Sequence, residues 1–187
     1  MDVGSSHIRG MVGRSNRPGP TFMYTCTHKL NRRFDSHMNT LCDRIWEDIL
    51  SKAKKWQENV TELKTLGKGK KATNFTIIEV APNYLAISVY HNKYSKDLFC
   101  LALQLLYERG KKGAELRPIK TSHPIIGTID YAVRPRNIKG KVPPMRATWI
   151  GAILVRSGVA IQTKDKPITI KLADKYLALR DYGPSSI

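Results

Sequence analysis

Two cysteines and two histidines near the N-terminus are the side chains best suited to metal chemistry, because zinc accepts thiolate and imidazole ligands. One residue separates Cys26 from His28, eight residues separate His28 from His37, and four separate His37 from Cys42. This spacing matches no standard zinc finger, and His37 and Cys42 are expected on different sides of one helix. We therefore predict no metal site and no bound cofactor.

Motifs that mark catalytic or nucleotide-binding sites are missing from the sequence. It contains no GxSxG nucleophile motif, no HExxH metal motif, no GxxxxGK[ST] phosphate loop and no GxGxxG segment. The segment Gly67–Lys71 is rich in glycine and lysine, but it has neither the spacing of a phosphate loop nor a preceding strand. The sequence therefore predicts a protein that is not an enzyme.

The strongest feature of the chain is its excess of positive charge. Its 187 residues include 32 Lys and Arg against 15 Asp and Glu, which gives a formal net charge of +17. Such a charge attracts polyanions, namely nucleic acid, anionic lipid surfaces and acidic proteins. Apolar residues make up 41% of the chain, enough for a folded core. Three cysteines without framework spacing indicate a reducing compartment.

Two glycine-containing segments, of which the second is also rich in proline, concentrate the cations that we predict to bind a polyanion. The candidate binding residues are Lys64, Lys68, Lys70, Lys71, Arg134, Arg136, Lys139, Lys141 and Arg146. On extended loops these side chains can follow a phosphate backbone or lie on anionic headgroups. The alternative interpretation is a pair of solvated loops, of which the first compensates a helix dipole. Aromatic residues are not interleaved with these charges, so base stacking is not expected.

Residues 1–33 are predicted to form a flexible basic arm, followed by a single globular domain at 34–187. No acidic residue lies between Asp2 and Asp35, and a polar segment with unbalanced charge does not offset the entropy lost on ordering. The arm contains one apolar triplet, which consists of Phe22, Met23 and Tyr24. This triplet is either a docking peptide for another molecule or a segment that packs on its own domain.

Hydrophobic periodicity predicts two main helices and several strands in the domain. Apolar residues at steps of three and four predict a helix from Phe34 to Leu66, and a second, buried helix runs from Ser95 to Gly110. The predicted strands are 74–80, 84–91, 125–133, 147–156, 159–163 and 168–172, with a tight hairpin at Ser157-Gly158 and a short helix at 173–181.

The order of these elements defines the expected fold class. Because the last three strands follow one another without helices, we predict an α+β fold, with a mainly antiparallel twisted sheet packed against two or three helices and a flexible basic N-terminal arm. Every apolar run is far shorter than the roughly 20 residues that span a bilayer. Any membrane contact is therefore expected to be peripheral.

The segment from Gly127 to Gly158 resembles the C-terminal part of rhabdovirus matrix proteins. It contains Gly127 and Tyr131 in a Gly-x-x-x-Tyr pattern, then a basic stretch, Lys141-Val-Pro-Pro-Met145 and an aliphatic run. In that family, a strand with this pattern leads through a basic stretch to Lys-x-Pro-Pro-Met and an aliphatic hairpin. The arm has no PPxY or PTAP budding motif, which suits a plant-infecting member better and leaves a budding role open.

The resemblance implies a structural viral matrix protein that self-assembles, condenses the ribonucleoprotein and contacts the inner face of the envelope through basic surfaces. Its partners would be the viral nucleocapsid or RNA, an anionic membrane surface and other copies of itself. It would be found in the virion and in the host cytoplasm, at membranes and in the nucleus. Family members polymerise through a short N-terminal segment, for which Phe22–Tyr24 is the candidate here. The alternative is a small basic RNA-binding protein, such as a viral RNA-silencing suppressor or a ribosome-associated factor.

Overall fold

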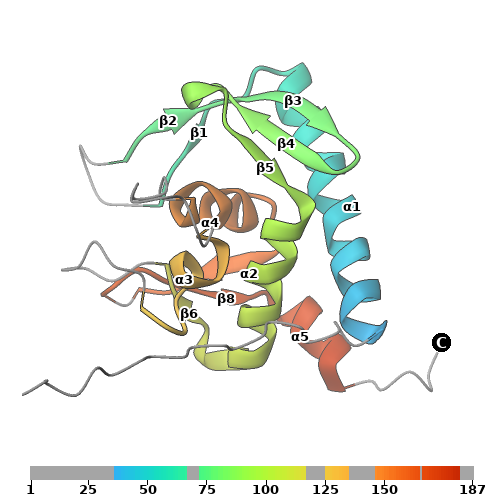
Figure 1. Ribbon diagram of the computed structural model, residues 1–187, viewed down its shortest axis with the longest axis vertical. Helices are drawn as coiled ribbons and strands as arrows, with labels where there is room; N and C mark the ends of the chain where they lie inside the picture. Colours follow the sequence, from blue (N-terminus) through green and yellow to red (C-terminus); the bar gives the residue numbers. More distant parts are fainter. Residues whose placement is uncertain (1–35, 67–71, 117–124, 135–145, 165, 182–187) are drawn as a thin grey trace, which may run out of the picture. The chain divides into compact units, whose positions relative to one another are not determined.

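Five α-helices and three small antiparallel sheets make up the part of the chain that the computed structural model describes, residues 36–66, 72–116, 125–134, 146–164 and 166–181 (Figure 1). The helices are α1 (Ser36–Glu58), α2 (Lys96–Arg109), α3 (Ile129–Val133), α4 (Ala147–Arg156) and α5 (Asp174–Asp181). The strands are β1 (Leu63–Lys64), β2 (Asn74–Phe75), β3 (Ile77–Ala81), β4 (Tyr84–Ile87), β5 (Lys93–Ser95), β6 (Ala114–Glu115), β7 (Ala160–Gln162) and β8 (Thr169–Leu172). This architecture confirms the predicted α+β class.

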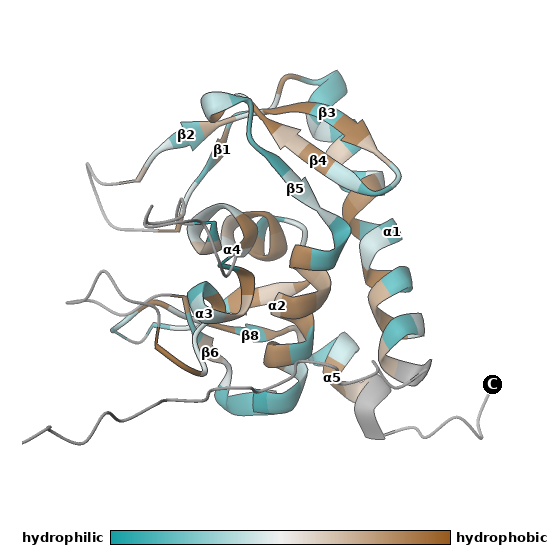
Figure 2. Cartoon of the chain, viewed as in Figure 1, coloured by the Kyte–Doolittle hydropathy of each residue, from teal (hydrophilic) through white to brown (hydrophobic). Residues whose placement is uncertain are grey.

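Helix α1 is amphipathic and packs its apolar side on the domain, as Figure 2 shows. The indole of Trp46 packs against the ring of Phe99 of α2, with the ring centres 5.1 Å apart and the planes tilted by 49°, and it donates a 2.7 Å hydrogen bond to the carbonyl of Pro82. The helix ends at Glu58, so its predicted continuation to Leu66 is wrong. Val60 adopts a left-handed φ of 47°, and Leu63 is buried from a strand rather than from a helix.

The predicted hairpin around Pro82-Asn83 is confirmed as β3 and β4, but the predicted strand 74–80 is not continuous, because residues 74–75 form β2 and pair with β1 in a separate sheet. Strands β3 and β4 pair antiparallel with Ala81 opposite Tyr84, and β5 adds a third strand on the other side of β4. Strand β4 ends at Ile87, earlier than predicted. The chain turns there through η2 (Val89–His91), a 3-10 segment with two residues in left-handed conformation.

Helix α2 is the centre of the core and confirms the predicted buried helix. Its buried side chains are Phe99, Ala102, Leu103 and Leu106. It contacts α1, α3, α4 and β8, and Gly110, with a φ of 54°, ends it before η3 (Gly110–Lys112). A helix that is apolar around most of its circumference must be buried on several sides, and these neighbouring elements bury α2 in this way.

Two segments predicted as strands are helices instead. Residues 129–133 form α3, whose first turn is capped because Thr128 Oγ1 accepts a 3.2 Å hydrogen bond from the Tyr131 amide. Residues 147–156 form α4, which is buried on most sides. A short apolar run is compatible with both a buried strand and a buried helix, so the periodicity could not separate them. The predicted hairpin at Ser157-Gly158 is likewise wrong, because Ser157 follows α4 and Gly158 leads into β7.

The third sheet has the strand order β6-β8-β7, with all pairs antiparallel. Strands β7 and β8 confirm the predicted strands at 159–163 and 168–172, and α5 confirms the predicted helix at 173–181. Strand β6 had no signal in the sequence because it contains only Ala114 and Glu115.

Cys42 of α1 and Cys100 of α2 form a disulfide, with their Cα atoms 5.6 Å apart. The cysteine spacing predicted a reducing compartment and hence no disulfide. For Cys42 and Cys100 this prediction is wrong. The two residues lie 58 positions apart in the sequence, and only the packing of α1 on α2 brings them together. The bond also removes Cys42 from the set of candidate zinc ligands.

All described residues belong to one unit that begins at Phe34, and the predicted arm lies outside the described residues.

Candidate polyanion-binding surface

Three of the nine predicted polyanion-binding residues lie in the described part of the chain, namely Lys64, Arg134 and Arg146. The other six lie outside the described residues and are Lys68, Lys70, Lys71, Arg136, Lys139 and Lys141. The same holds for the predicted docking triplet of Phe22, Met23 and Tyr24. The described part of the candidate surface therefore consists of the residues that flank these segments.

Lys64 is exposed on β1 between two buried neighbours, Leu63 and Thr65. Alternation along the strand places those neighbours in the core and the lysine outside. The Thr65 amide donates to the Thr73 carbonyl at 3.0 Å, and the Thr73 amide donates to Thr65 Oγ1 at 2.9 Å. The segment that carries Lys68, Lys70 and Lys71 therefore begins and ends beside a hydrogen-bonded pair.

Arg146 directly precedes α4 and is half-buried. Its carbonyl accepts hydrogen bonds from the amides of Trp149 and Ile150 at 3.2 and 3.1 Å, which fixes its backbone at the first turn. Its positive charge also acts on the buried phenol of Tyr94. Burial raises the pKa of Tyr94 to about 12, while Arg146 and a hydrogen bond with Asn92 act in the opposite direction.

Arg134 requires a correction, because its guanidinium is buried in an ion pair rather than displayed to a polyanion. The Nη2 atom pairs with Oδ2 of Asp130, one helical turn earlier, and the two side chains are only 8% and 2% exposed. An arginine that follows an aspartate by four residues on a helix can meet it directly. The sequence showed this i,i+4 spacing, but it did not show that α3 is a helix packed on α2.

Three acid-free basic segments are joined to the domain around α4. A Cβ atom at Gly151 of α4 would collide with Leu116 Cδ1 and lie 3.5 Å from Leu66 Cδ1. Leu66 directly precedes segment 67–71, and Leu116 precedes segment 117–124. Arg146, at the start of α4, follows segment 135–145. Figure 1 shows β1, α3 and α4 on the same side of the domain.

The charge of the chain is distributed unevenly between these segments and the described domain. The described residues contain 18 Lys and Arg and 12 Asp and Glu, whereas the rest of the chain contains 14 Lys and Arg and 3 Asp and Glu. Segments 67–71, 117–124 and 135–145 together contain eight basic residues and no acidic residue. These three segments thus carry +8 of the net charge of +17, more than the +6 of all the described residues together.

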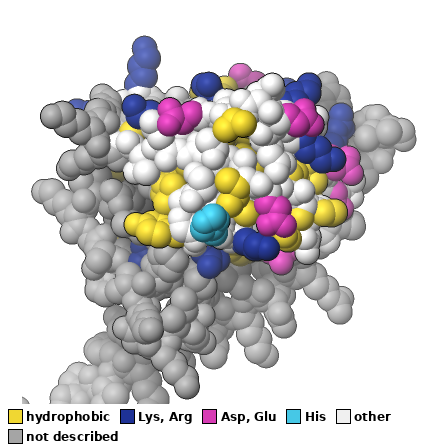
Figure 3. Space-filling view, turned by 90° about the horizontal axis from the view of Figure 1, so that it is seen from above, with side chains coloured by type: hydrophobic (Ala, Val, Ile, Leu, Met, Phe, Trp, Pro, Cys, Tyr) yellow, Lys and Arg dark blue, Asp and Glu magenta, His cyan; other side chains and the backbone are white. Residues whose placement is uncertain are grey.

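The outer face of the β3–β5 sheet has a different character. Lys93 Nζ lies 3.4 Å from Glu79 Oε2, donates to Tyr84 Oη at 3.1 Å and lies 4.4 Å from the ring centre of Tyr84. The hydrogen bond from Tyr84 and the charge of Lys93 lower the pKa of Glu79. Figure 3, which views this end from above, shows basic, acidic and hydrophobic side chains interspersed. This face therefore offers little net attraction to a polyanion.

No group of three or more His, Cys, Asp or Glu side chains that could hold a metal ion occurs among the described residues.

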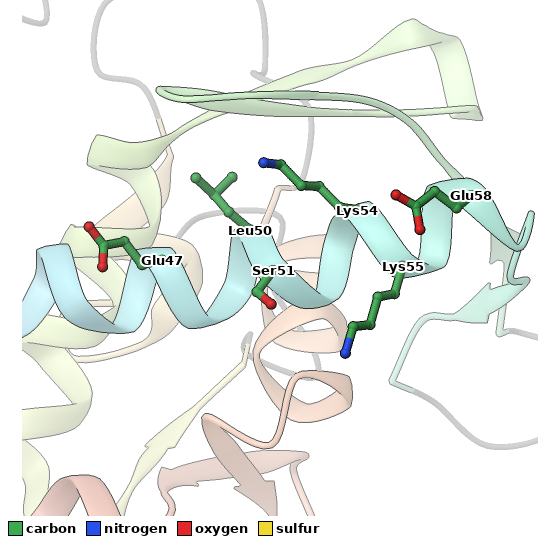
Figure 4. Close-up of a pocket in the computed structure, with 6 residues that line it drawn as sticks. All are labelled: Glu47, Leu50, Ser51, Lys54, Lys55 and Glu58. Carbon is green, nitrogen blue, oxygen red and sulfur yellow. The ribbon is translucent and has the colours of Figure 1, made fainter.

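The described surface has a shallow groove along α1, and all the residues that line this groove belong to that helix (Figure 4). Across the described ranges, no helix combines the length and the hydropathy needed to cross a membrane.

Comparison with known proteins gives no relative from which a function could be transferred. No protein-family model, curated protein or solved structure shows significant similarity to this chain.

Proposed function

We propose that this chain is a matrix-type structural protein that coats an anionic scaffold. In this proposal it condenses a ribonucleoprotein, contacts an anionic membrane from one side and associates with copies of itself. The observation that supports the proposal is the joining of three acid-free basic segments to one side of the domain around α4. The sequence resemblance to rhabdovirus matrix proteins supports the same function, although residues 129–133 and 147–156 form helices and not the strand and the hairpin that the resemblance implied.

The proposed contact is collective and not specific for sequence. Each of the eight cations lies within five residues of a described residue, which corresponds to at most about 19 Å of chain. Many such contacts release counterions from a polyanion, so affinity falls steeply as salt increases. Each phosphate that is neutralised adds about 0.9 to the logarithmic salt slope on duplex nucleic acid and about 0.7 on a single strand.

A salt titration with a matched pair of variants tests this surface. One variant replaces Lys68, Lys70 and Lys71 with Gln, and the control replaces the exposed Lys111 and Lys112 of η3 together with Lys164. Binding is measured by flotation with phosphatidylserine vesicles and by gel shift with RNA. We expect the first variant to lose more affinity than the control. Loss of up to three phosphate contacts should reduce its logarithmic salt slope by up to about 2.7 on duplex nucleic acid or about 2.1 on a single strand, while the slope of the control changes less. Equal losses in the two variants would contradict the proposed surface.

The two polyanions also separate the proposed function from its rival. A matrix-type protein should bind both anionic vesicles and nucleocapsid or RNA. Binding to RNA without binding to vesicles would instead support a small basic RNA-binding protein.

The proposed docking role of Phe22, Met23 and Tyr24 is tested by replacing all three with Ala, which should abolish large assemblies in light scattering while polyanion binding persists.

A further inference from the structure

The exposed face of α1 carries a charge pattern that reverses its sign about Ser51. Arg44, Glu47, Ser51, Lys55 and Glu58 are all exposed. At 3.6 residues per turn, all five side chains lie within about 40° of one direction around the helix axis. Along this face the charges are positive, negative, neutral, positive and negative. Positions that are equally far before and after Ser51 therefore have opposite charges.

This face of α1 is unpartnered within the described domain. The residues that line its groove of about 470 Å³ are Glu47, Leu50, Ser51, Lys54, Lys55 and Glu58. Figure 4 shows these side chains on successive turns of α1, and Figure 1 shows α1 at one edge of the domain. The four charged residues of this face take part in none of the ion pairs among the described residues; they are Arg44, Glu47, Lys55 and Glu58.

We propose that α1 pairs with α1 of a second copy of this chain, antiparallel and with a two-fold axis at Ser51. In such an isologous contact, a residue n positions after Ser51 faces the residue n positions before it. Glu47 then faces Lys55 and Arg44 faces Glu58, and the symmetry produces each pair twice. The small side chain of Ser51 allows the helices to approach closely at the crossing point. A parallel pairing in register would instead place like charges together, which disfavours it.

The charges also favour a second copy over a polyanion as the occupant of this face. The charged residues that line the groove are two acids, Glu47 and Glu58, and two bases, Lys54 and Lys55, so a polyanion gains little net attraction there. A single helix pair buries less than the roughly 1,600 Å² of a standard interface, so the contact should be weak by itself. This inference deepens the proposed self-assembly and rests on it for the role of the contact. The pairing itself can be measured without any polyanion.

Charge reversal tests the two-fold pairing in the full-length chain with Phe22, Met23 and Tyr24 replaced by Ala, so that polymers formed through the arm do not obscure the dimer. Lys55→Glu places two acidic residues opposite each other at both symmetry-related positions, and Glu47→Lys does the same with two basic residues. In sedimentation velocity at low salt, we expect each single variant to weaken dimerisation at least tenfold. The double variant Glu47→Lys/Lys55→Glu restores both pairs and should recover dimerisation. Lys112→Glu, an equal change of charge on η3, is the control and should leave dimerisation unchanged. A double variant as weak as the singles, or an equally weak control, would overturn the inference.

Cysteine cross-linking tests the position of the axis. In a Cys26→Ser background, Ser51→Cys places two thiols beside each other, and oxidised glutathione can convert them to one disulfide while it is reduced to two molecules of glutathione. Glu58→Cys is the control on the same face, because its symmetry mate lies 14 residues away, about 21 Å along the helices. We expect a covalent dimer only with Ser51→Cys, and equal cross-linking at both positions would refute the axis. If the chain with Phe22, Met23 and Tyr24 replaced by Ala is a monomer at low salt, while the wild type binds polyanions and polymerises through its arm, this inference is overturned and the proposed function stands.

Discussion

The buried pair of Asp130 and Arg134 offers the sharpest test of the difference between a surface cation and a structural one. Replacing Arg134 with Met removes the guanidinium and leaves the Asp130 carboxylate buried, with its side chain 2% exposed. Breaking a buried pair by removing one partner costs about 3–5 kcal/mol. With a urea m-value of about 2 kcal/mol per M, a loss of about 4 kcal/mol lowers the unfolding midpoint by about 2 M.

A second variant keeps this test decisive if Arg134→Met fails to fold. The double variant Asp130→Leu/Arg134→Met removes both charges, and apolar replacement of a buried pair is often neutral or stabilising. We therefore expect the double variant to recover most of the lost stability in urea denaturation followed by circular dichroism. If Arg134→Met unfolds within about 0.5 kcal/mol of the wild type and instead loses polyanion affinity, Arg134 is a surface ligand and our interpretation of the pair is wrong.

Three further perturbations follow from the core. Replacing both Cys42 and Cys100 with Ala removes a cross-link over 58 residues, which should lower the free energy of unfolding by roughly 4 kcal/mol, and a reductant should reproduce the loss in thermal unfolding of the wild type only. Gly151→Ala drives a methyl group into Leu116 Cδ1, which costs about 1–3 kcal/mol of overpacking, but it also gains about 1 kcal/mol of helix propensity. The net loss in urea denaturation should therefore be up to about 2 kcal/mol, and a stabilised variant would contradict the packing around α4. Burial raises the pKa of Tyr94 to about 12, whereas the unfolded chain releases this proton near pH 10. Stability should therefore fall as the pH rises from 10 through 12, and Tyr94→Phe should lack this part of the alkaline transition.

Local patterns predicted the elements whose apolar residues have a clear period or clear boundaries. Helix α2 followed from its apolar run between Ser95 and Gly110, and the β3–β4 hairpin followed from the turn at Pro82-Asn83. Both signals lie within a few residues of the structure that they specify. The α+β class was predicted correctly although 147–156, one of the three consecutive strands on which it rested, is helix α4. The other two, β7 and β8, still follow each other without a helix and pair antiparallel, which excludes a wound parallel sheet.

The errors occur where burial and not local sequence decides the structure. The run Ala147–Arg156 is apolar at every position except Thr148 and Arg156, so no clear period separates a strand from a buried helix. Helix α1 was predicted too long because Leu63 continues its apolar spacing while lying in a strand. The role of Arg134 was missed for the same reason, since its pairing with Asp130 requires α3 to be a helix and to be covered.

The amino-acid sequence alone determined the charge of this protein, the acid-free basic segments and the period of its main helices, because composition and short-range spacing are properties of the chain itself. Only the tertiary structure decided that Leu66 and Leu116 meet at Gly151, that Cys42 reaches Cys100, and that the sign-reversing face of α1 points outward. These facts depend on contacts between residues far apart in the chain, and such contacts are chosen by how the apolar faces of separate elements bury one another.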